Sequence, residues 1–572
     1  MDESFDTIIV GGGSAGAALA ARLTERSAHR VLVLEAGPDT PPDSVPDVIA
    51  DSYPGLSYFD PRYHWQGLRV YARSPRGNAA SVASSKLEQA KVMGGGSSIN
   101  GQFAVRGFPA DYDEWEAMGL KGWGWQHMLP CLKRLERDLD FGTAPVHGNS
   151  GPMPLRRVFP KDWAGYSRAI FSAIKGIGFP YGDDLNAGIE DGAFPLPLTN
   201  ENDRRVSTAT GYLDRAVRKR PNLVLSPDTQ VLRLILEGKR VTGVEVERNG
   251  SFNRHSAREV VVCAGALHTP PMLLRAGIGP AGHLKEMGVP VVHDLPGVGE
   301  NLGDHPHIGI GCHLQPAARQ PRNLRRHIFF ALRWSSRLAG CTPADMFMMP
   351  VNRTGWHPLG MRMGSLVACV NKSYSRGLVR LTSADPKANP YVDINMLSDG
   401  RDLQRLVDAF KLIYRIMESP EVKAATTMWF LAGYSDAVRD LSIKRTSNWW
   451  KTAAAAAIFG ASPISRDWLY RQRFGSPDRV HKLMQDDEAI ADWVKSSVYS
   501  GWHVSGSCRM GPEGDRMAAL DQRLRVRGIA GLRVVDASVF PTIPSANTNI
   551  STIAVAERAA ELIHEDFAAR AV

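Results

Sequence analysis

Near the N-terminus, hydrophobic positions first form a short continuous run and then recur with helical spacing. Residues 6–10 (DTIIV) are apolar and β-branched, which predicts a strand, and residues 17–23 (AALAARL) predict a helix. A second apolar run at residues 31–34 predicts another strand, which ends at Glu35. The glycine-rich segment 11–16 (GGGSAG) separates the first strand from the helix. The pattern therefore predicts a strand, a tight turn, a helix and a second strand that delivers an acid.

Gly11, Gly13 and Gly16 have the GxGxxG spacing of dinucleotide-binding turns. The first glycine lets the chain turn, the second lets backbone amides approach a pyrophosphate, and the third lets the helix pack closely on the strand. The helix N-terminus adds a partial positive charge beside the diphosphate. Glu35 follows about 20 residues later, where a carboxylate accepts hydrogen bonds from a ribose diol. We predict a dinucleotide site here rather than a purely structural glycine turn.

The same turn also fits GxSxG, the nucleophile elbow of α/β hydrolases, with Ser14 as the nucleophile. An elbow follows several earlier strands and an oxyanion loop, whereas a single predicted strand precedes Ser14. The hydrolase interpretation is therefore disfavoured.

Residues 91–101 (KVMGGGSSING) form a second glycine cluster with no helical or strand period. Consecutive glycines let the backbone lie flat against a planar ligand, and Ser97, Ser98 and Asn100 can bond phosphate or ring heteroatoms. We expect a cofactor-lining loop rather than a flexible surface loop. Residues 258–266 (REVVVCAGA) predict a buried strand that ends in small residues, across which a ligand can lie.

Two polar segments near the C-terminus carry candidate catalytic side chains. Residues 501–511 (GWHVSGSCRMG) contain His503, and an apolar run before Asp536 predicts another strand. A helical pattern begins at about Asn549, so that Asn547 lies at its N-terminal cap, where amides are favoured. The structural alternatives are a helix cap for Asn547 and a hydrogen-bonded loop residue for His503.

Length and composition exclude several classes of protein. The chain has 572 residues, of which 43% are hydrophobic and 22% charged, so it is globular rather than disordered or fibrous. A net charge of +9 is small for this length and no run of five or more like charges occurs, which argues against nucleic-acid binding. The six cysteines have no CxxC or metal-like spacing, so we expect neither a disulfide nor a metal site. The start has no basic or long apolar leader, and we expect a cytoplasmic location.

In their order along the chain, these motifs resemble the glucose-methanol-choline (GMC) family of flavin oxidoreductases. The resemblance runs from end to end and includes GGGSAG with Glu35, GGGSSIN, HTPPMLLRAGIGP, GVGENLGDH, SADPKANPYVDINMLSDGRDL and VVDASVFPTIPSANTN. The stretches WHVSGS, SANTN, DYDEWEAMGLKGWGW and VHGNSGPMP are most similar to furanic and aryl-alcohol oxidases of the family. The resemblance implies an α/β fold in which a Rossmann-like FAD-binding domain is interleaved with an α+β substrate-binding domain, the GMC fold.

The resemblance also implies FAD as the cofactor and assigns two catalytic residues. His503 matches the family's active-site histidine, and Asn547 lies where other members have a second histidine or an asparagine. Glu35 is expected to bond the adenosine ribose, and the backbone of Val231 is expected to contact adenine. The cofactor-binding set that we predict is Gly11, Gly13, Ser14, Ala15, Gly16, Glu35, Ala36, Met93, Gly94, Gly96, Ser97, Asn100, Gly101, Val231, Ala264, Gly265, Trp502, Asp536, Ala537, Asn547, Thr548 and Asn549.

One position departs from part of the family. Some members attach FAD covalently through a histidine of the second glycine loop, and Ile99 stands at that position here. We therefore predict noncovalent FAD.

The family resemblance and the local patterns predict a discontinuous domain organisation. We expect an FAD-binding domain at residues 1–158, 200–311 and 497–572, and a substrate-binding domain at 159–199 and 312–496. Within the latter, residues 322–338 and 449–468 mix arginine with aromatic side chains at helical spacing. We expect buried lid or cap helices there rather than a membrane-surface contact, because each apolar stripe is short.

The predicted activity is oxidation of a primary alcohol, of aryl, benzylic or furanic type, to the aldehyde. Neutral His503 would accept the hydroxyl proton while the carbinol carbon passes hydride to flavin N5, and Asn547 would hold the same oxygen. The unperturbed pKa of histidine, near neutrality, suits this role. O₂ is the expected electron acceptor. The alternatives are an FAD dehydrogenase that uses a quinone or another acceptor, and a non-catalytic nucleotide-binding protein, against which the complete cofactor frame argues.

Overall fold

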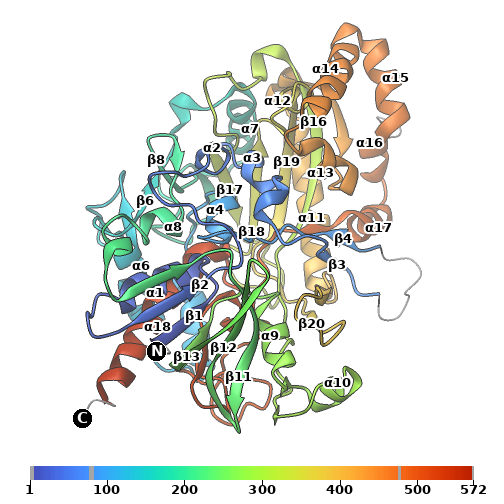
Figure 1. Ribbon diagram of the computed structural model, residues 1–572. Helices are drawn as coiled ribbons and strands as arrows, with labels where there is room; N and C mark the ends of the chain where they lie inside the picture. The colour runs from blue at the N-terminus through green and yellow to red at the C-terminus, as the bar shows by residue number, and fades with distance from the viewer. Residues whose placement is uncertain (1–4, 76–82, 475–477, 570–572) are drawn as a thin grey trace.

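The segment predicted to bind a dinucleotide opens a parallel sheet. β1 (Phe5–Val10) lies between β2 (Val31–Leu34) and β13 (Ser251–Val262), and the three strands run in the same direction. The computed structural model describes residues 5–75, 83–474 and 478–569 (Figure 1). This first sheet has the strand order β10-β2-β1-β13-β12-β11, and β24 also pairs with β13. Its remaining strands are β10 (Leu223–Ser226), β11 (Gln230–Glu237), β12 (Arg240–Arg248) and β24 (Leu532–Val534).

β13 joins two parts of the first sheet. Its first half pairs with antiparallel β12, and its second half pairs with parallel β1 and β24. The strands β1 and β2 are buried along almost their whole length, as expected for a parallel sheet covered by helices. The carboxyl ends of β1, β2, β13 and β24 therefore meet at one edge of the sheet, where such sheets bind their ligands.

Helices α1 (Ser14–Leu23) and α18 (Thr548–Ala569) pack against each other, and α18 also packs against α6 (Trp125–Leu135) (Figure 1). Glu557, in the middle of α18, is fully buried. Its carboxylate accepts hydrogen bonds from Arg22 of α1, from Arg134 of α6 and from the hydroxyl of Tyr212. A buried carboxylate is tolerated only with such partners. The helix near the C-terminus is thereby fixed against the helix near the N-terminus.

A second, antiparallel sheet has the strand order β22-β16-β19-β18-β17-β7, with β23 paired to β16. Helix α11 (Gly400–Met417) packs on one face of it, against β16 and β19. Side chains alternate between the two faces of a strand, so the other face is free to line a cavity. The strands are β7 (Gly192–Pro195), β16 (Pro306–Leu314), β17 (Phe330–Trp334), β18 (Met346–Val351), β19 (Met363–Val370), β22 (Thr426–Leu431) and β23 (Tyr499–Ser500).

Shorter elements surround the two sheets. A third sheet has the order β5-β6-β8-β9, with β5 (Glu136–Asp138), β6 (Met153–Arg156), β8 (Leu198–Glu201) and β9 (Arg204–Arg205). Three strand pairs lie outside it: β3 (Arg69–Val70) with β4 (Ser85–Lys86), β14 (Ile278–Gly279) with β15 (His293–Asp294), and β20 (Leu378–Arg380) with β21 (Tyr391–Asp393). The remaining α-helices are α2 (Asp47–Ala50), α3 (Gly55–Tyr58), α4 (Gly96–Ile99), α5 (Pro109–Ala117), α7 (Gly165–Gly176), α8 (Thr208–Gly211), α9 (Thr269–Arg275), α10 (Ala281–Glu286), α12 (Pro420–Ala425), α13 (Asp436–Ser442), α14 (Thr446–Ala461), α15 (Pro463–Phe474), α16 (Arg479–Leu483) and α17 (Asp487–Ser497).

The prediction of a lid helix at residues 322–338 is wrong. This fully described stretch contains the strand β17 and otherwise irregular chain. Its apolar run IFFALRW is buried and pairs with β18 and β7. A short apolar run fits a buried strand as well as a helix, and periodicity alone does not separate the two.

The second predicted lid segment, 449–468, is helical but not buried as expected. It forms most of α14 and the start of α15, which project together at the top of Figure 1. The polar side chains of Asn448 and Thr452 are buried, whereas Trp449, Trp450 and Trp468 are 40%, 65% and 58% exposed. Among the described residues, no helix has both the length and the apolar composition needed to cross a bilayer.

The second sheet bears on the proposed domain boundaries. β16 crosses the predicted boundary between residues 311 and 312, although all of its pairing partners belong to the second sheet. β23, from the segment predicted to belong to the FAD-binding domain, also pairs with β16. We therefore propose that the substrate-binding unit begins near residue 306.

Candidate active site

A cavity of about 750 Å³ lies where the carboxyl ends of the first sheet face the second sheet. Most of the sequence-predicted residues line it, from the first glycine turn, the second glycine loop and the C-terminal segments. These lining residues are Gly11, Gly13, Ser14, Ala15, Glu35, Ala36, Gly96, Asn100, Gly101, Val231, Ala264, Gly265, Trp502, His503, Asp536, Ala537, Asn547, Thr548 and Asn549. The structure places the other four predicted residues behind this lining: Gly16, Met93, Gly94 and Ser97.

The first glycine turn has no room for a side chain at Gly11 or Gly16. A Cβ at Gly16 would lie 1.9 Å from the carbonyl oxygen of Gly11, and a Cβ at Gly11 would lie 2.5 Å from that of Cys263. Gly11 also has a φ of +102°, which favours glycine. The close approach of α1 to β1 therefore depends on Gly16, which packs beneath the turn rather than against the cavity.

Two helix N-termini meet at the cavity. Gly13, at the N-cap of α1, provides no side-chain cap, and Gly13, Ser14 and Ala15 line the cavity. The hydroxyl of Ser14 donates a 2.7 Å hydrogen bond to Oδ1 of Asn549, in the first turn of α18. The Nδ2 group of Asn549 is buried and has no acceptor among the described residues. The unpaired donor and the two positive helix ends fit an anionic or strongly polar ligand such as FAD.

Glu35 is held with both carboxylate oxygens in place. Oε2 accepts from the backbone N–H of Gly12 and Oε1 from that of Gly37, each at 2.9 Å. Burial raises the pKa of Glu35 to about 7, although the two backbone hydrogen bonds lower it. Hydroxyl donors from a ribose would satisfy the remaining acceptor capacity of this carboxylate.

The second glycine loop has a lining part and a supporting part. Gly95, Gly96, Asn100 and Gly101 line the cavity, and α4 gives the loop one short helical turn. Behind them, the N–H of Gly94 donates a 2.7 Å hydrogen bond to the carbonyl of Gly12. Met93 fills the space that a Cβ at Gly12 would need. The supporting residues Met93, Gly94 and Ser97 therefore position the two glycine loops relative to each other.

Asp536 organises the end of the first sheet. Its carboxylate accepts from the N–H of Gly265, from the hydroxyl of Thr269 and from the N–H of Ser538. The cavity wall from β13 and that from β24 are thereby joined through one side chain. Val231 reaches the cavity at a register irregularity of β11. Together, these residues form a continuous cradle that fits an extended dinucleotide.

A chain of hydrogen bonds determines the tautomer of His503. Nε2 of His305 lies 3.2 Å from the carbonyl oxygen of Pro544, which can only accept, so Nε2 of His305 carries the proton. Nδ1 of His305 is then the acceptor for Nδ1–H of His503, at 2.9 Å. Nε2 of neutral His503 is then an acceptor, and it accepts a 3.0 Å hydrogen bond from Nδ2 of Asn547. His503 therefore presents Nε2 to the cavity.

The backbone around His503 is held as firmly as its ring. The N–H of His503 donates a 2.9 Å hydrogen bond to buried Asp304. Trp502 has a φ of +60°, which costs about 1–2 kcal/mol for a residue with a Cβ. Burial, with a smaller contribution from His307, lowers the pKa of His503 to about 3. His503 is therefore neutral at ordinary pH, and burial disfavours its protonated form.

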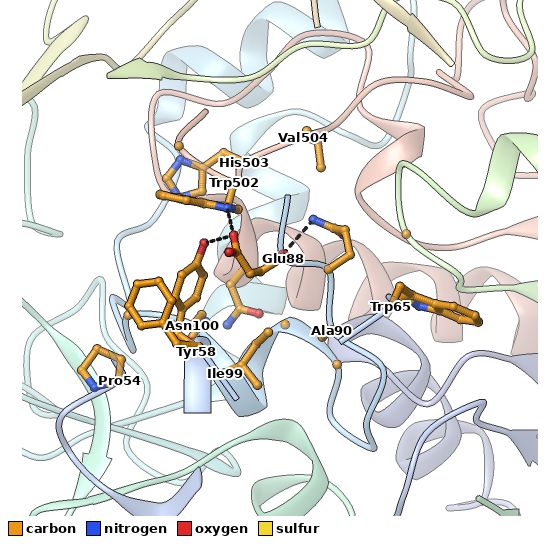
Figure 2. Close-up of a pocket in the computed structure, with 18 of the residues that line it drawn as sticks. Pro54, Tyr58, Trp65, Glu88, Ala90, Ile99, Asn100, Trp502, His503 and Val504 are labelled. Atoms are coloured by element: carbon orange, nitrogen blue, oxygen red, sulfur yellow. Dashed lines mark hydrogen bonds between the residues drawn. The ribbon is translucent and has the colours of Figure 1, made fainter. Parts of the chain in front are cut away.

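Glu88 forms a polar centre in the aromatic part of the cavity. Figure 2 shows the hydroxyl of Tyr58 and the indole N–H of Trp502 directed at its carboxylate, at 2.6 and 3.3 Å. Arg439 of α13 pairs with the same carboxylate, and its guanidinium lies over the ring of Tyr434. Glu88 thus connects α13 to the residue next to His503.

The sequence analysis missed Asp304, His305 and Glu88. The first two lie in the GVGENLGDH stretch, directly before an apolar run. A paired acid and histidine just before an apolar strand is a signal that could have indicated them. Glu88 has no such signal, because its partners come from distant parts of the chain.

One buried cluster away from the cavity has ligand atoms close enough for a metal: Glu136, Asp138 and His147. Nδ1 of His147 lies 2.7 Å from Glu136 and 3.2 Å from Asp138, and its Nε2 lies 2.6 Å from Asp184. Although burial lowers the pKa of His147, hydrogen bonds to these carboxylates raise it to about 10. The carboxylates also pair with two arginines, Arg106 and Arg157. We therefore describe the cluster as an ion-pair network and assign no metal to it.

Comparison with known proteins agrees with this geometry. Two family models described as GMC oxidoreductase match residues 5–307 and 373–556. The chain is 39% identical to 5-(hydroxymethyl)furfural oxidase of Methylovorus sp. (strain MP688), over 98% of this chain and 99% of that relative. It is 35% identical to the oxygen-dependent choline dehydrogenase of Vibrio vulnificus, over 98% and 95% of the two chains. The crystal structure of pyridoxine 4-oxidase from Mesorbium loti superposes with a TM-score of 0.80 at 26% identity, over 98% and 99% of the two chains.

Proposed function

The chain belongs to the GMC oxidoreductase family, and we propose that it oxidises a primary aryl, benzylic or furanic alcohol to the aldehyde with O₂ as electron acceptor. The predicted family and fold are confirmed, and the protein is an FAD-dependent alcohol oxidoreductase. The observation that carries the proposal is the neutral His503 with its Nε2 lone pair facing Asn547.

FAD, when bound, supplies the acceptor for the hydride of the alcohol. The residues that would hold it are the N-terminal turn of α1, Glu35, the second glycine loop and the first turn of α18. Ile99 lines the cavity at the position where some relatives carry the attaching histidine, and it has no nucleophilic atom. We propose that FAD is bound noncovalently.

The side chains at the cavity perform the proton chemistry. Nε2 of His503 and Nδ2 of Asn547 border the same part of the cavity. An alcohol oxygen placed there can donate its proton to Nε2 while it accepts from Nδ2. As Nε2 takes the proton, Nδ1–H keeps its hydrogen bond to His305, so the ring does not turn during the transfer.

The aromatic lining supports the proposed substrate class. Tyr58, Phe59, Phe103, Tyr434 and Trp502 all line the cavity, and aromatic side chains favour contact with planar apolar groups. The similarity to a relative named for furfural oxidation points in the same direction. O₂ is supported as the electron acceptor because one relative is named as a furfural oxidase and another as an oxygen-dependent choline dehydrogenase.

A spectroscopic experiment tests the proposal. Purified protein should show flavin absorbance that is bleached anaerobically by 4-methoxybenzyl alcohol without added NAD. In air, aldehyde and hydrogen peroxide should form in equal amounts. Reoxidation by a quinone but not by O₂ would indicate the dehydrogenase instead, and a bound flavin that no alcohol reduces would indicate a non-catalytic binding protein.

Acid precipitation tests the mode of cofactor attachment. The flavin should appear in the supernatant, because Ile99 cannot bond to the ring. Flavin that stays with the denatured protein would contradict noncovalent binding.

A further inference from the structure

One wall of the cavity carries a buried positive charge that forms no ion pair with any carboxylate of the described residues. Arg353 lines the cavity, is 6% exposed, and lies with its guanidinium 4.1 Å from the ring centroid of Tyr53. One of its amino groups donates to the carbonyl of Arg325. Its Nε is buried and has no acceptor among the described residues. A guanidinium with donors to spare thus borders the ligand space.

A second guanidinium lies beside the same wall. Arg326 is 3% exposed and stacks 4.9 Å from the ring centroid of Phe103, which lines the cavity. Its Nε donates to the carbonyl of Ile328, but Nη1 and Nη2 are buried without an acceptor in the described chain. Burial lowers the pKa of Arg326 to about 9, which still leaves it cationic near neutral pH.

The neighbouring groups do not balance these charges. Arg205, whose charge acts on Arg326, donates to backbone carbonyls and to Asn100. The acid of this region, Asp51, forms its ion pair with Arg325. Among the described residues, no carboxylate lies within ion-pair distance of Arg205, Arg326 or Arg353. Buried charges are normally paired, because an uncompensated ion costs several kcal/mol.

Strand register places this charge far from the base. Phe347 of β18 pairs with Cys369, which pairs with His307 beside His503. Val351 lies four residues farther along β18, and Arg353 lies two residues beyond Val351. Arg353 is six residues beyond Phe347, so at about 3.3 Å per residue it lies up to about 20 Å along the strand direction from the level of the base. The diphosphate of FAD is already matched by the N-terminus of α1, so these cations are left for another anion.

We propose that Arg353, supported by Arg326, binds a carboxylate at the far end of the substrate, so that this enzyme prefers aryl alcohols that carry an anionic group remote from the carbinol. The inference rests on the proposed function for the identity of the reacting group. Arg353 is then a specificity-determining residue: it binds the substrate but takes no part in the proton transfer. Met349 and Val351 line the cavity between the two ends and contact the apolar body of such a substrate.

A substrate series tests the proposal. The substrates are 4-(carboxyalkoxy)benzyl alcohols with linkers from one methylene upward, each compared with its methyl ester. At the matching length, kcat/KM for the acid should exceed that for the ester by about 10- to 100-fold, as charge-assisted hydrogen bonds provide. Arg353→Gln should abolish this ratio through KM, and Arg353→Lys should retain part of it. Arg322→Gln removes the same charge from an exposed position of the segment that carries Arg326 and should preserve the ratio.

The outcomes separate the inference from the proposed function. Equal kcat/KM for acid and ester at every length, with the ester oxidised, would overturn the anion site and leave the proposed function standing. If no alcohol is oxidised, the alkoxybenzene acids that lack the carbinol still test the site, since they should raise the melting temperature of the wild type but not of Arg353→Gln.

Arg326 provides a second readout. Arg326→Met removes an unpaired buried cation and keeps the packing on Phe103, so the melting temperature without substrate should rise while the acid-to-ester ratio falls. A lower melting temperature with an unchanged acid-to-ester ratio would show that Arg326 serves only its hydrogen bond to Ile328 and its stacking on Phe103, and would overturn its role in the proposal.

Discussion

Two buried histidines of this protein differ in charge: His503 is neutral and His147 is protonated. His503, at the cavity, has its pKa lowered to about 3, whereas His147, in the ion-pair network beside β5, has its pKa raised to about 10. Burial lowers the pKa of both. The difference lies in their neighbours: the ring of His503 contacts His305 and Asn547, and that of His147 contacts Glu136, Asp138 and Asp184.

The comparison shows that neighbouring groups, and not depth in the protein, decide the role of a buried histidine. A neutral ring among uncharged partners can accept a proton, which is the property of a general base. A protonated ring among carboxylates can only hold charges together. The surroundings of His503 therefore fit a catalytic role, and those of His147 fit a role in stabilising the fold.

The largest expected effect is on His503. His503→Ala should keep the fold and bound FAD but slow flavin reduction by roughly 10²–10⁴, the usual contribution of a positioned general base. Anaerobic stopped-flow reduction by a benzylic alcohol measures this step alone. Asn547→Ala should slow the same step, and the double variant should lose less than the product of both effects, because both groups act on one oxygen. A near-normal reduction rate in FAD-loaded His503→Ala would remove the base from the mechanism.

The next effect concerns the stability that His147 provides. His147→Leu removes one of the three cations that hold these buried carboxylates and should lower the free energy of unfolding by about 3–5 kcal/mol at pH 6. Because the folded pKa is raised from 6.5 to about 10, this contribution is complete below pH 6.5 and is lost as the pH rises through 10. The difference between variant and wild type in denaturant titrations should shrink over that range.

A pH-independent difference would contradict the charged state of His147. His481→Gln is the matched control, because His481 is exposed and should change the free energy of unfolding little at any pH.

A third buried titratable group extends the comparison to the cofactor. Glu35→Ala removes an acceptor for the remote ribose, so FAD affinity should fall by about 1.5–3 kcal/mol with little change in the reduction rate of the loaded fraction. Titration of apoprotein with FAD measures the affinity, and exposed Glu25→Ala is the control. Unchanged affinity would exclude Glu35 from the site.

The smallest expected effect is on the orientation of the base. His305→Leu removes the acceptor for Nδ1–H of His503, and flavin reduction should slow by about 2- to 10-fold, the worth of one buried hydrogen bond. His305→Gln, whose amide oxygen can accept the same proton, should restore most of the rate. Equal rates in both variants would show that His305 only fills space.

The sequence predicted the fold where local pattern and topology agree. The strand, turn and helix at residues 5–23 are found as expected, because glycine spacing and apolar period specify that unit locally. Residues 330–334 form a strand against expectation, because a buried apolar run takes its structure from the strands beside it. The exposure of the α14 tryptophans could not be predicted from the sequence either, because burial depends on what packs against a helix.

Within the site, the sequence could supply residue types but not their states. His503 and Asn547 were placed together by resemblance, and the structure brings them to 3.0 Å. The tautomer of His503 depends on His305 and Pro544, and its lowered pKa depends on burial and on His307. These residues belong to other parts of the chain. The charge of Arg326 and Arg353 is visible in the sequence, but the lack of a partner is a property of the folded chain.

The first sheet contains strands from both ends of the chain, which has a consequence for synthesis of the protein. More than 500 residues separate Val10 of β1 from Leu532 of β24, yet both strands flank β13, and α1 packs on α18. At about 5–20 residues per second, a ribosome needs roughly half a minute to two minutes between them. During that time the glycine turn of β1 and α1 exists without the helix that carries Asn549. FAD binding must therefore follow translation of residues 532–569. Until these residues are made, the incomplete first sheet exposes surface that chaperones can bind.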